Sequence, residues 1–175
     1  PERPEPLSVD RQEIPDTLRN RDQWVCWRYK WDDDRDEWTK VPLEAGAGGF
    51  ASSTDPDTWS SFAKAISYHD NGDSDTDGAG FVVHEEDTFF GVDLDDCRDP
   101  DTVDVKPWAA ELLAELDTYA EVSPSGTGLR GFGVGFLPEG RRKTAAPDGV
   151  GDVELYDNGR YLTVTGHVLD GSKDD

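Results

Sequence analysis

Short apolar segments of strand length, separated by turn-forming residues, set the main limit on what this chain can fold into. Such segments are typical of β-strands, whereas apolar residues at helical spacing occupy only two stretches, at about 56–69 and 105–117. The expected strands cover residues 79–84, 88–94, 119–123, 129–136, 152–156 and 160–165. This order predicts an α+β fold in which two helices cover one face of a sheet.

Local signals predict where several elements begin and end. Residues 23–29 and 37–42 flank an acidic turn, which indicates a hairpin. Asp55 before Pro56 is typical of a helix start. The Asn-Gly pair at 158–159 predicts a tight hairpin between the last two strands.

A length of 175 residues favours one domain, because a chain of this size can bury one core. We expect that domain at residues 22–168. An extended lead-in with one short helical turn is expected over 1–21, and a tail or linker over 169–175. The first residue is Pro rather than Met, so we expect the chain to be a fragment of a longer protein.

The chain has 39 acidic and 17 basic residues, a net charge of −22, and the acidic excess is spread along its length. Distributed charge is typical of proteins in concentrated salt, where the Debye length falls to about 3 Å at 1 M. We therefore expect a high-salt cytoplasm such as that of a haloarchaeon. The only compact basic cluster is Arg141, Arg142 and Lys143. Contact with nucleic acid should then be local, through a few Arg side chains, metal ions and aromatic rings.

The two cysteines and three histidines have no paired metal-ligand spacing, which argues against a structural zinc site. There is no signal peptide and no apolar run near 18 residues. We expect a soluble cytoplasmic protein with no membrane partner.

The segment from Phe89 to Asp95 is an apolar run that ends in two carboxylates. Because side chains alternate between the faces of a strand, Asp93 and Asp95 are expected on one face and Leu94 on the other. Carboxylates suit Mg²⁺ or Mn²⁺, and a pair of such ions can act on both oxygens of a phosphoryl displacement. From composition alone, two Asp that end a strand in solvent are the simpler interpretation.

A Ser/Gly-rich turn covers residues 123–128 and leads into a predicted strand. Gly126, Gly128 and Gly131 match the spacing of a dinucleotide-binding motif, but the helix that this motif requires does not follow. The turn can instead offer N–H groups and hydroxyls to a phosphate, with Arg130 adding charge. A tight β-turn without a ligand is the alternative.

A third feature is Glu154, which is expected on the same face of its strand as Asp152 and Tyr156. Taken singly, a Glu on a strand is more often solvated than a ligand.

In this order, the three features resemble the motifs of primase-polymerases of the archaeo-eukaryotic primase superfamily, in particular those of phages, archaeal viruses and plasmids. That family has a strand ending in D-x-D, then a Ser/Gly turn leading into a strand with a basic residue or His, then an acidic residue on a later strand. The matching segments are 90–95, 123–130 and 153–155, with further similarity at 38–42, 51–56, Trp59 and 160–166. The resemblance therefore spans about residues 22–166.

The resemblance implies an α+β, RRM-like catalytic core, with a mixed or antiparallel sheet flanked by helices and a preceding hairpin-helix subdomain. It implies a template-directed DNA primase or polymerase of a virus or mobile element. The implied partners are a single-stranded DNA template, a primer 3′ end, NTP or dNTP, and a fused or associated helicase. Asp93, Asp95 and Glu154 would be catalytic and bind Mg²⁺ or Mn²⁺. The residues expected to bind the nucleotide triphosphate are Lys40, Ser123, Ser125, Gly126, Arg130 and Arg160.

Many relatives carry a His in the second motif, where this chain has Arg130 or, in a shifted alignment, Leu129. Arg can make the phosphate contact because it is bidentate and permanently charged, but it cannot act as a neutral proton carrier. Two other functions stay open from the sequence: a nucleic-acid or nucleotide-binding module with weak catalysis, and a metal-dependent nuclease.

Overall fold

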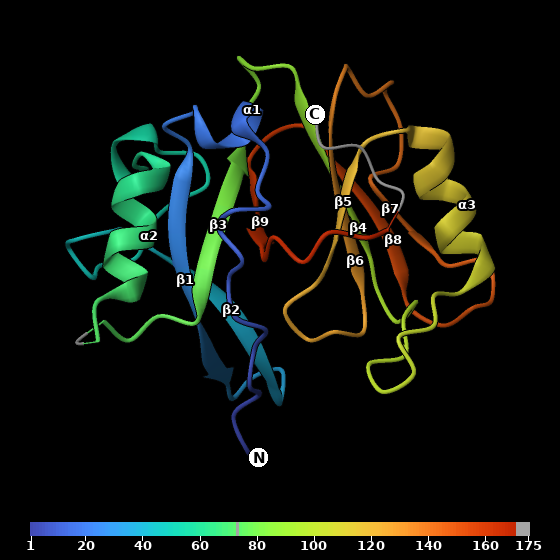
Figure 1. The fold of residues 1–175 in the computed structure, drawn as a ribbon, viewed down its shortest axis with the longest axis horizontal. Coiled ribbons are helices and arrows are strands. Elements are labelled where there is room, and N and C mark those ends of the chain that lie inside the picture. Colours follow the sequence, from blue (N-terminus) through green and yellow to red (C-terminus); the bar gives the residue numbers. More distant parts are fainter. Residues whose placement is uncertain (73, 171–175) are drawn as a thin grey trace.

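The chain forms two antiparallel β-sheets that pack against each other, each covered on its outer side by one helix (Figure 1). The computed structural model describes residues 1–72 and 74–170. The four-stranded sheet has the order β2-β1-β3-β9, and the five-stranded sheet has the order β5-β6-β4-β8-β7. The elements are α1 (Asp16–Arg19), β1 (Trp24–Asp32), β2 (Glu37–Leu43), a 3-10 turn (Pro56–Thr58), α2 (Phe62–Asp70), β3 (Gly78–Val83), β4 (Phe89–Leu94), α3 (Pro107–Leu116), β5 (Tyr119–Val122), β6 (Leu129–Val134), β7 (Lys143–Ala145), β8 (Asp152–Tyr156) and β9 (Arg160–Val164).

The α+β class is confirmed, but the prediction that both helices cover one sheet is wrong. Helix α2 packs on β1 and β3, whereas α3 packs on β6 of the other sheet. The hairpin predicted at residues 158–159 is also wrong, because β8 pairs with β4 and β7 while β9 pairs with β3. Of the Asn-Gly pair only Gly159 has a positive φ, of 65°, whereas the tight turn needs two. The chain crosses from one sheet to the other there, and the RRM-like description stays a prediction.

The helix predicted over 56–69 begins later than expected. Asp55 caps only the 3-10 turn, where its side chain accepts a hydrogen bond from the N–H of Asp57. Ser60 then pairs with Trp24 through two backbone hydrogen bonds, which hold the chain extended. Ser61 is the N-cap of α2, because its hydroxyl accepts from the N–H of Lys64. None of the described helices is long and apolar enough to span a membrane.

Part of the predicted lead-in belongs to the hydrophobic core. Ile14 and Leu18 are each only 1% exposed, and the carbonyl of Leu18 accepts a 3.0 Å hydrogen bond from the indole of Trp24. The core therefore starts before residue 22, the predicted boundary. At the other end, the N–H of Leu169 donates to the carbonyl of Ala120. Residues 171–175 of the predicted tail lie outside the described residues.

One face of β4 changes from apolar to charged along its length, and this change separates the core from the polar part of the sheet interface. Phe81 of the four-stranded sheet packs edge-on against Phe89 and Phe132 of the five-stranded sheet, with ring centroids 5.6 and 6.0 Å apart. Two residues after Phe89, Gly91 lies against Leu162 of β9. Two residues further, Asp93 brings a carboxylate to the same face.

Candidate active site

Asp93 lies in the middle of the five-stranded sheet, between charged residues of both neighbouring strands. The register aligns it with Arg130 of β6 on one side and with Glu154 of β8 on the other. Leu94 turns to the opposite face and is buried in the cluster that packs under α3. Two of the three predicted metal ligands are thus direct cross-strand neighbours, because β4 and β8 are paired.

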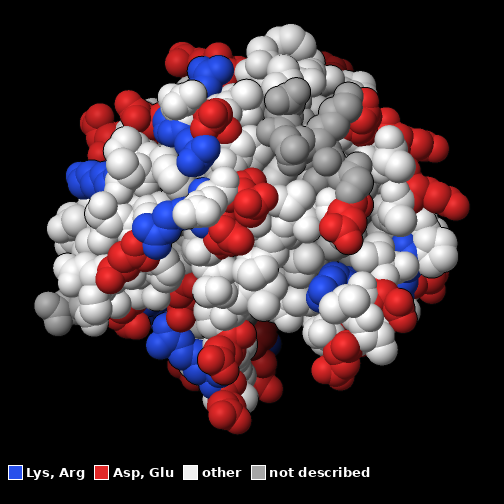
Figure 2. Space-filling view, viewed as in Figure 1, with Lys and Arg blue, Asp and Glu red and all other residues white. Residues whose placement is uncertain are grey.

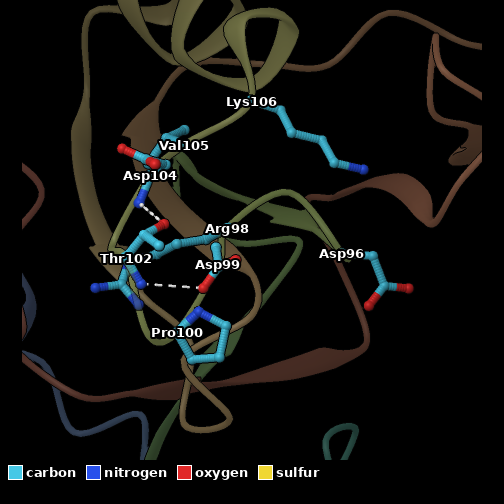
Figure 3. A pocket seen from close by; sticks show the side chains of 8 residues that line it. All are labelled: Asp96, Arg98, Asp99, Pro100, Thr102, Asp104, Val105 and Lys106. Carbon is cyan, nitrogen blue, oxygen red and sulfur yellow. Dashed lines mark hydrogen bonds between the residues drawn. The ribbon is translucent and has the colours of Figure 1, made fainter.

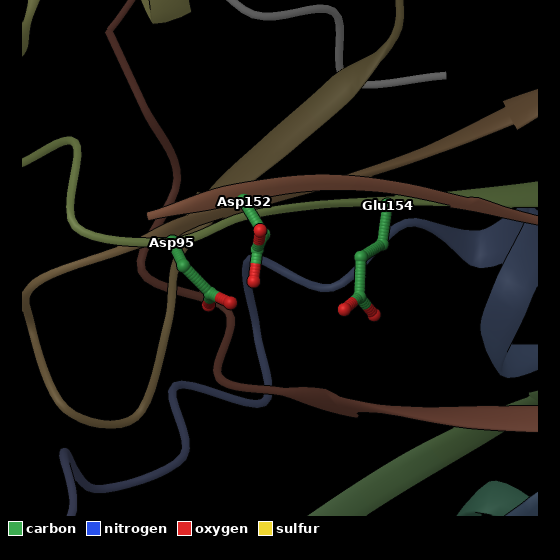
Figure 4. A group of neighbouring side chains, drawn as sticks. All are labelled: Asp95, Asp152 and Glu154. Atoms are coloured by element: carbon green, nitrogen blue, oxygen red, sulfur yellow. The ribbon is translucent and has the colours of Figure 1, made fainter. Parts of the chain in front are cut away.

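Three carboxylates gather at the end of β4. The N–H of Asp95 donates to the carbonyl of Asp152 at 2.9 Å, which continues the β4–β8 pairing beyond the strand. Carboxylate oxygens of Asp95, Asp152 and Glu154 all lie within 4.8 Å of one another. Figure 4 shows the three side chains on the same side of their strands. Asp152 was not among the predicted ligands, although its spacing from Glu154 repeats the D-x-D spacing of β4.

Gly151 allows this approach. Its φ of +78° is in the left-handed region, and a Cβ at this position would lie 2.3 Å from the carbonyl oxygen of Asp95. Any other residue would collide with the backbone of Asp95, just beyond the end of β4. Gly151 therefore sets how closely Asp152 can lie to Asp95.

Each carboxylate makes ionisation of its neighbours less favourable, because like charges repel. Burial, and next the negative charge of Asp93, raise the pKa of Asp95 from 3.8 to about 6. The charge of Glu154 acts in the same direction, while Arg130 and Lys40 oppose it. A divalent cation would remove this repulsion, and hard carboxylate oxygens are the ligands that Mg²⁺ and Mn²⁺ prefer. The donor set therefore fits such an ion.

Glu154 has two further partners, Lys143 and Tyr156. Burial raises the pKa of Glu154, but the hydrogen bonds from these two residues outweigh it and the pKa is lowered. Lys143 Nζ lies 2.8 Å from Glu154 Oε1 and also 2.8 Å from Asp152 Oδ2. The phenol of Tyr156 donates to Glu154 Oε2. No sequence motif pointed to Lys143, because the exposed strand β7 that carries it has no apolar pattern.

Arg130 is held by the protein between the two sheets. Its Nε donates to Asp93 Oδ1 at 3.1 Å, and its Nη1 donates to the carbonyl and the hydroxyl of Thr163 on β9. Only 8% of its side chain is exposed. The phosphate contact expected for Arg130 would have to compete with these bonds, which fix its guanidinium beside Asp93.

A second buried acid, Glu121, ties β5 to the end of β9. It is fully buried and accepts hydrogen bonds of 2.8 Å from the N–H groups of Thr165 and Gly166 and one of 2.7 Å from the phenol of Tyr119. Its negative charge also acts on Arg130. No sequence pattern singled out Glu121, since a Glu on a strand gives no signal that it is buried.

Two further predicted phosphate ligands, Lys40 and Arg160, lie on β2 and β9 of the four-stranded sheet. Burial, and next the charge of Arg130, lower the pKa of Lys40 to about 8, while Asp93 and Asp95 act to raise it. Among the described residues Lys40 has no ion-pair partner within 4.0 Å. The Arg160 guanidinium lies over the ring of Tyr156, 5.1 Å from its centroid. Lys40 therefore lies near Asp93 and Asp95 without forming an ion pair among the described residues, whereas Arg160 is placed against Tyr156, whose phenol donates to Glu154.

The Ser/Gly turn lies beside the end of β4, where the N–H of Cys97 donates to the carbonyl of Thr127. Much of its hydrogen bonding is internal. The Ser123 hydroxyl accepts from the N–H of Gly128 and lies 3.1 Å from the Ser125 hydroxyl, while the N–H of Gly126 donates to the Ser123 carbonyl. A phosphate at this turn would be bound chiefly by hydroxyls, and the predicted phosphate role of the turn stays a prediction.

A pocket lies in the loop after β4, between Asp96 and Lys106 (Figure 3). The loop is shaped by Asp99, whose side chain accepts from the N–H groups of residues 101 and 102. Arg98 connects it to the Ser/Gly turn through a 2.7 Å hydrogen bond to the carbonyl of Gly126. The pocket therefore adjoins the second predicted motif.

Figure 2 shows acidic side chains spread over the face that it presents, with basic side chains scattered between them. Several of the basic residues are paired with acids, such as Arg3 with Asp77 and Arg11 with Asp70. The described residues on this face form no broad basic field for a nucleic-acid backbone.

Comparison with known proteins gives one strong similarity. The chain is 39% identical over 157 residues to the DNA primase-polymerase of Nitratiruptor phage NrS-1. It is thus similar to one part of a DNA primase-polymerase. The aligned region covers 87% of this chain but only 20% of the length of that primase-polymerase. No protein-family model matches the chain.

Proposed function

We propose that this chain is the nucleotidyl-transfer domain of a template-directed DNA primase-polymerase. It would add nucleotides to a primer 3′ hydroxyl or join two nucleotides to start a primer. The observation that carries this proposal is the convergence of carboxylates from β4 and β8 in a chain that is 39% identical to a primase-polymerase.

In this proposal Asp95, Asp152 and Glu154 hold Mg²⁺ or Mn²⁺, and Asp93 is a further ligand. Arg130 contacts Asp93 through Oδ1, and among the described residues the other oxygen, Oδ2, has no hydrogen-bond partner. A bound divalent ion would neutralise charge on the reacting phosphate. The protein supplies the fixed geometry, since the acidic residues lie on paired strands and Arg130 orients Asp93.

Lys40 and Arg160 are proposed to bind the triphosphate, together with the hydroxyls of Ser123 and Ser125 in the turn that contains Gly126. A half-buried ammonium without an ion-pair partner is costly, and an anionic ligand would compensate its charge. The same argument supports Lys40 more strongly than Arg130, which already has protein partners.

Primer extension tests the proposal. Wild type should extend a primer on a single-stranded template with Mg²⁺ or Mn²⁺, and Asp95→Asn should reduce extension by at least about 100-fold, as expected for loss of a metal ligand. Asp33→Asn is the matched control, because Asp33 is an exposed acid in the turn between β1 and β2. A wild type that binds nucleotide but does not extend would indicate a binding module, and shortening of the primer would indicate a nuclease.

The proposed setting is the replication of a virus or other mobile element in concentrated salt. The relative is a phage protein, and the net charge of −22 supports the salt requirement. A helicase joined to or associated with this domain is part of the same proposal. If salt is required, the protein should stay folded in molar KCl and unfold in dilute buffer, and full stability at low salt would refute the salt requirement.

A further inference from the structure

Lys143 belongs to the compact basic cluster of the sequence but to none of the motifs above. It lies on β7, the edge strand of the five-stranded sheet, directly opposite Glu154 of β8. Its Nζ contacts Asp152 Oδ2 and Glu154 Oε1, both at 2.8 Å. One ammonium thus bridges two of the three carboxylates that lie within 4.8 Å of one another.

This ammonium does electrostatically what a bound metal ion would do. It places a positive charge between acids that otherwise repel one another, and it uses the carboxylate oxygens that a divalent ion would need. A divalent ion carries twice its charge and can use Asp95 as well. Lys143 and the ion would therefore compete for the same oxygens.

The structure also indicates that Lys143 can leave. Its side chain is 57% exposed, and Asp152 and Glu154 are its only ion-pair partners among the described residues. An exposed ion pair of a long, flexible Lys side chain is weak compared with chelation by several carboxylates. Movement of this side chain needs no change in the strands that carry the acids.

We propose that Lys143 is a tethered counter-ion that occupies the cation site of the metal-free protein and must leave Asp152 and Glu154 before a divalent ion binds. This inference rests on the proposed function, because it requires that these carboxylates bind metal. If Lys143 has this role, the acids stay close together in the absence of metal, but they bind a divalent ion more weakly than they would without Lys143.

Mn²⁺ titration without nucleotide tests the inference, by calorimetry or by the electron paramagnetic resonance signal of free Mn²⁺. Lys143→Gln should bind Mn²⁺ about five- to tenfold more tightly than wild type, in line with the loss of a competing exposed ion pair. Lys64→Gln removes the same charge from the exposed face of α2, on the other sheet, and should change the Kd by less than about twofold.

Thermal unfolding gives a second readout. Without metal, Lys143→Gln should have a lower Tm than wild type, because Asp152 and Glu154 lose their counter-ion, and saturating Mn²⁺ should raise its Tm by more than it raises that of wild type. Equal or weaker Mn²⁺ binding by Lys143→Gln would overturn the inference and leave the proposed function standing. If neither wild type nor Lys143→Gln binds Mn²⁺, both proposals fail.

Discussion

Replacing Asp95 with Asn should stabilise the metal-free protein at neutral pH, although it removes a proposed metal ligand. The pKa of Asp95 is about 6 in the folded protein, against an ordinary value of 3.8. The folded state therefore holds this proton more tightly than the unfolded state does. The stability linked to the proton is fully present below about pH 3.8 and is lost as the pH rises through 6. At pH 7.5 Asp95 of the wild type is ionised and this contribution to stability is absent. The Asp95→Asn variant carries no charge at this position, so burial does not penalise it.

The size of this stabilisation follows from the pKa shift of Asp95. A difference of about two pKa units corresponds to about 3 kcal/mol, at 1.36 kcal/mol per unit. Because Asp95 lies at a strand end and is partly exposed to solvent, screening reduces this value, and we expect about 1.5 kcal/mol. That corresponds to a rise in Tm of roughly 3–6 °C for a chain of this size. By pH 4 the gain should shrink to a few tenths of a kcal/mol.

Urea unfolding in EDTA at pH 7.5 and pH 4 measures both values. Asp33→Asn has the same change in net charge at an exposed turn and should change the free energy of unfolding by less than about 0.5 kcal/mol. Adding Mn²⁺ should reverse the order, because wild type gains binding energy that Asp95→Asn loses. A neutral or destabilised Asp95→Asn at pH 7.5, or a gain that persists undiminished at pH 4, would refute the reasoning.

Three further substitutions test other parts of the site. Gly151→Ala should lower both the free energy of unfolding and Mn²⁺ affinity, because its Cβ would collide with the carbonyl of Asp95; unchanged Mn²⁺ affinity would contradict this. Arg130→Met should cost about 3 kcal/mol in urea unfolding, since it leaves Asp93 as an unpaired, largely buried charge; a neutral effect would show that the pair has no structural role. Lys40→Met should weaken nucleotide binding in a filter or fluorescence assay. In wild type that binding should fall as the pH rises above about 8, the pKa of Lys40, and a variant with the same pH profile would exclude Lys40 from the phosphate site.

The sequence by itself predicted the strands that carry the site, because their signals are local. Alternation along residues 88–94 and 152–156 fixes which side chains share a face, and this needs no knowledge of neighbouring strands. The helix predicted over 105–117 is confirmed as α3 for the same reason. Asp55 correctly signals a turn, the 3-10 turn at Pro56–Thr58. The turn does not continue into a helix, because the backbone pairing of Ser60 with Trp24 holds the chain extended.

Only the tertiary structure decided which charged residues meet. That β8 and β9 belong to different sheets depends on long-range pairing, so the Asn-Gly signal at 158–159 could not reveal it. Pairing of β8 with β4 and β7 brings Asp152 to Asp95 and Lys143 to Glu154. Pairing of β6 with β4 places Arg130 against Asp93, and packing of the two sheets brings Thr163 to Arg130. The sequence therefore determined that two strands each present paired carboxylates. Strand pairing within the five-stranded sheet decided which acids converge and that Lys143 lies beside them, and packing against the other sheet brought Thr163 to Arg130, since those distances depend on contacts between segments far apart in the chain.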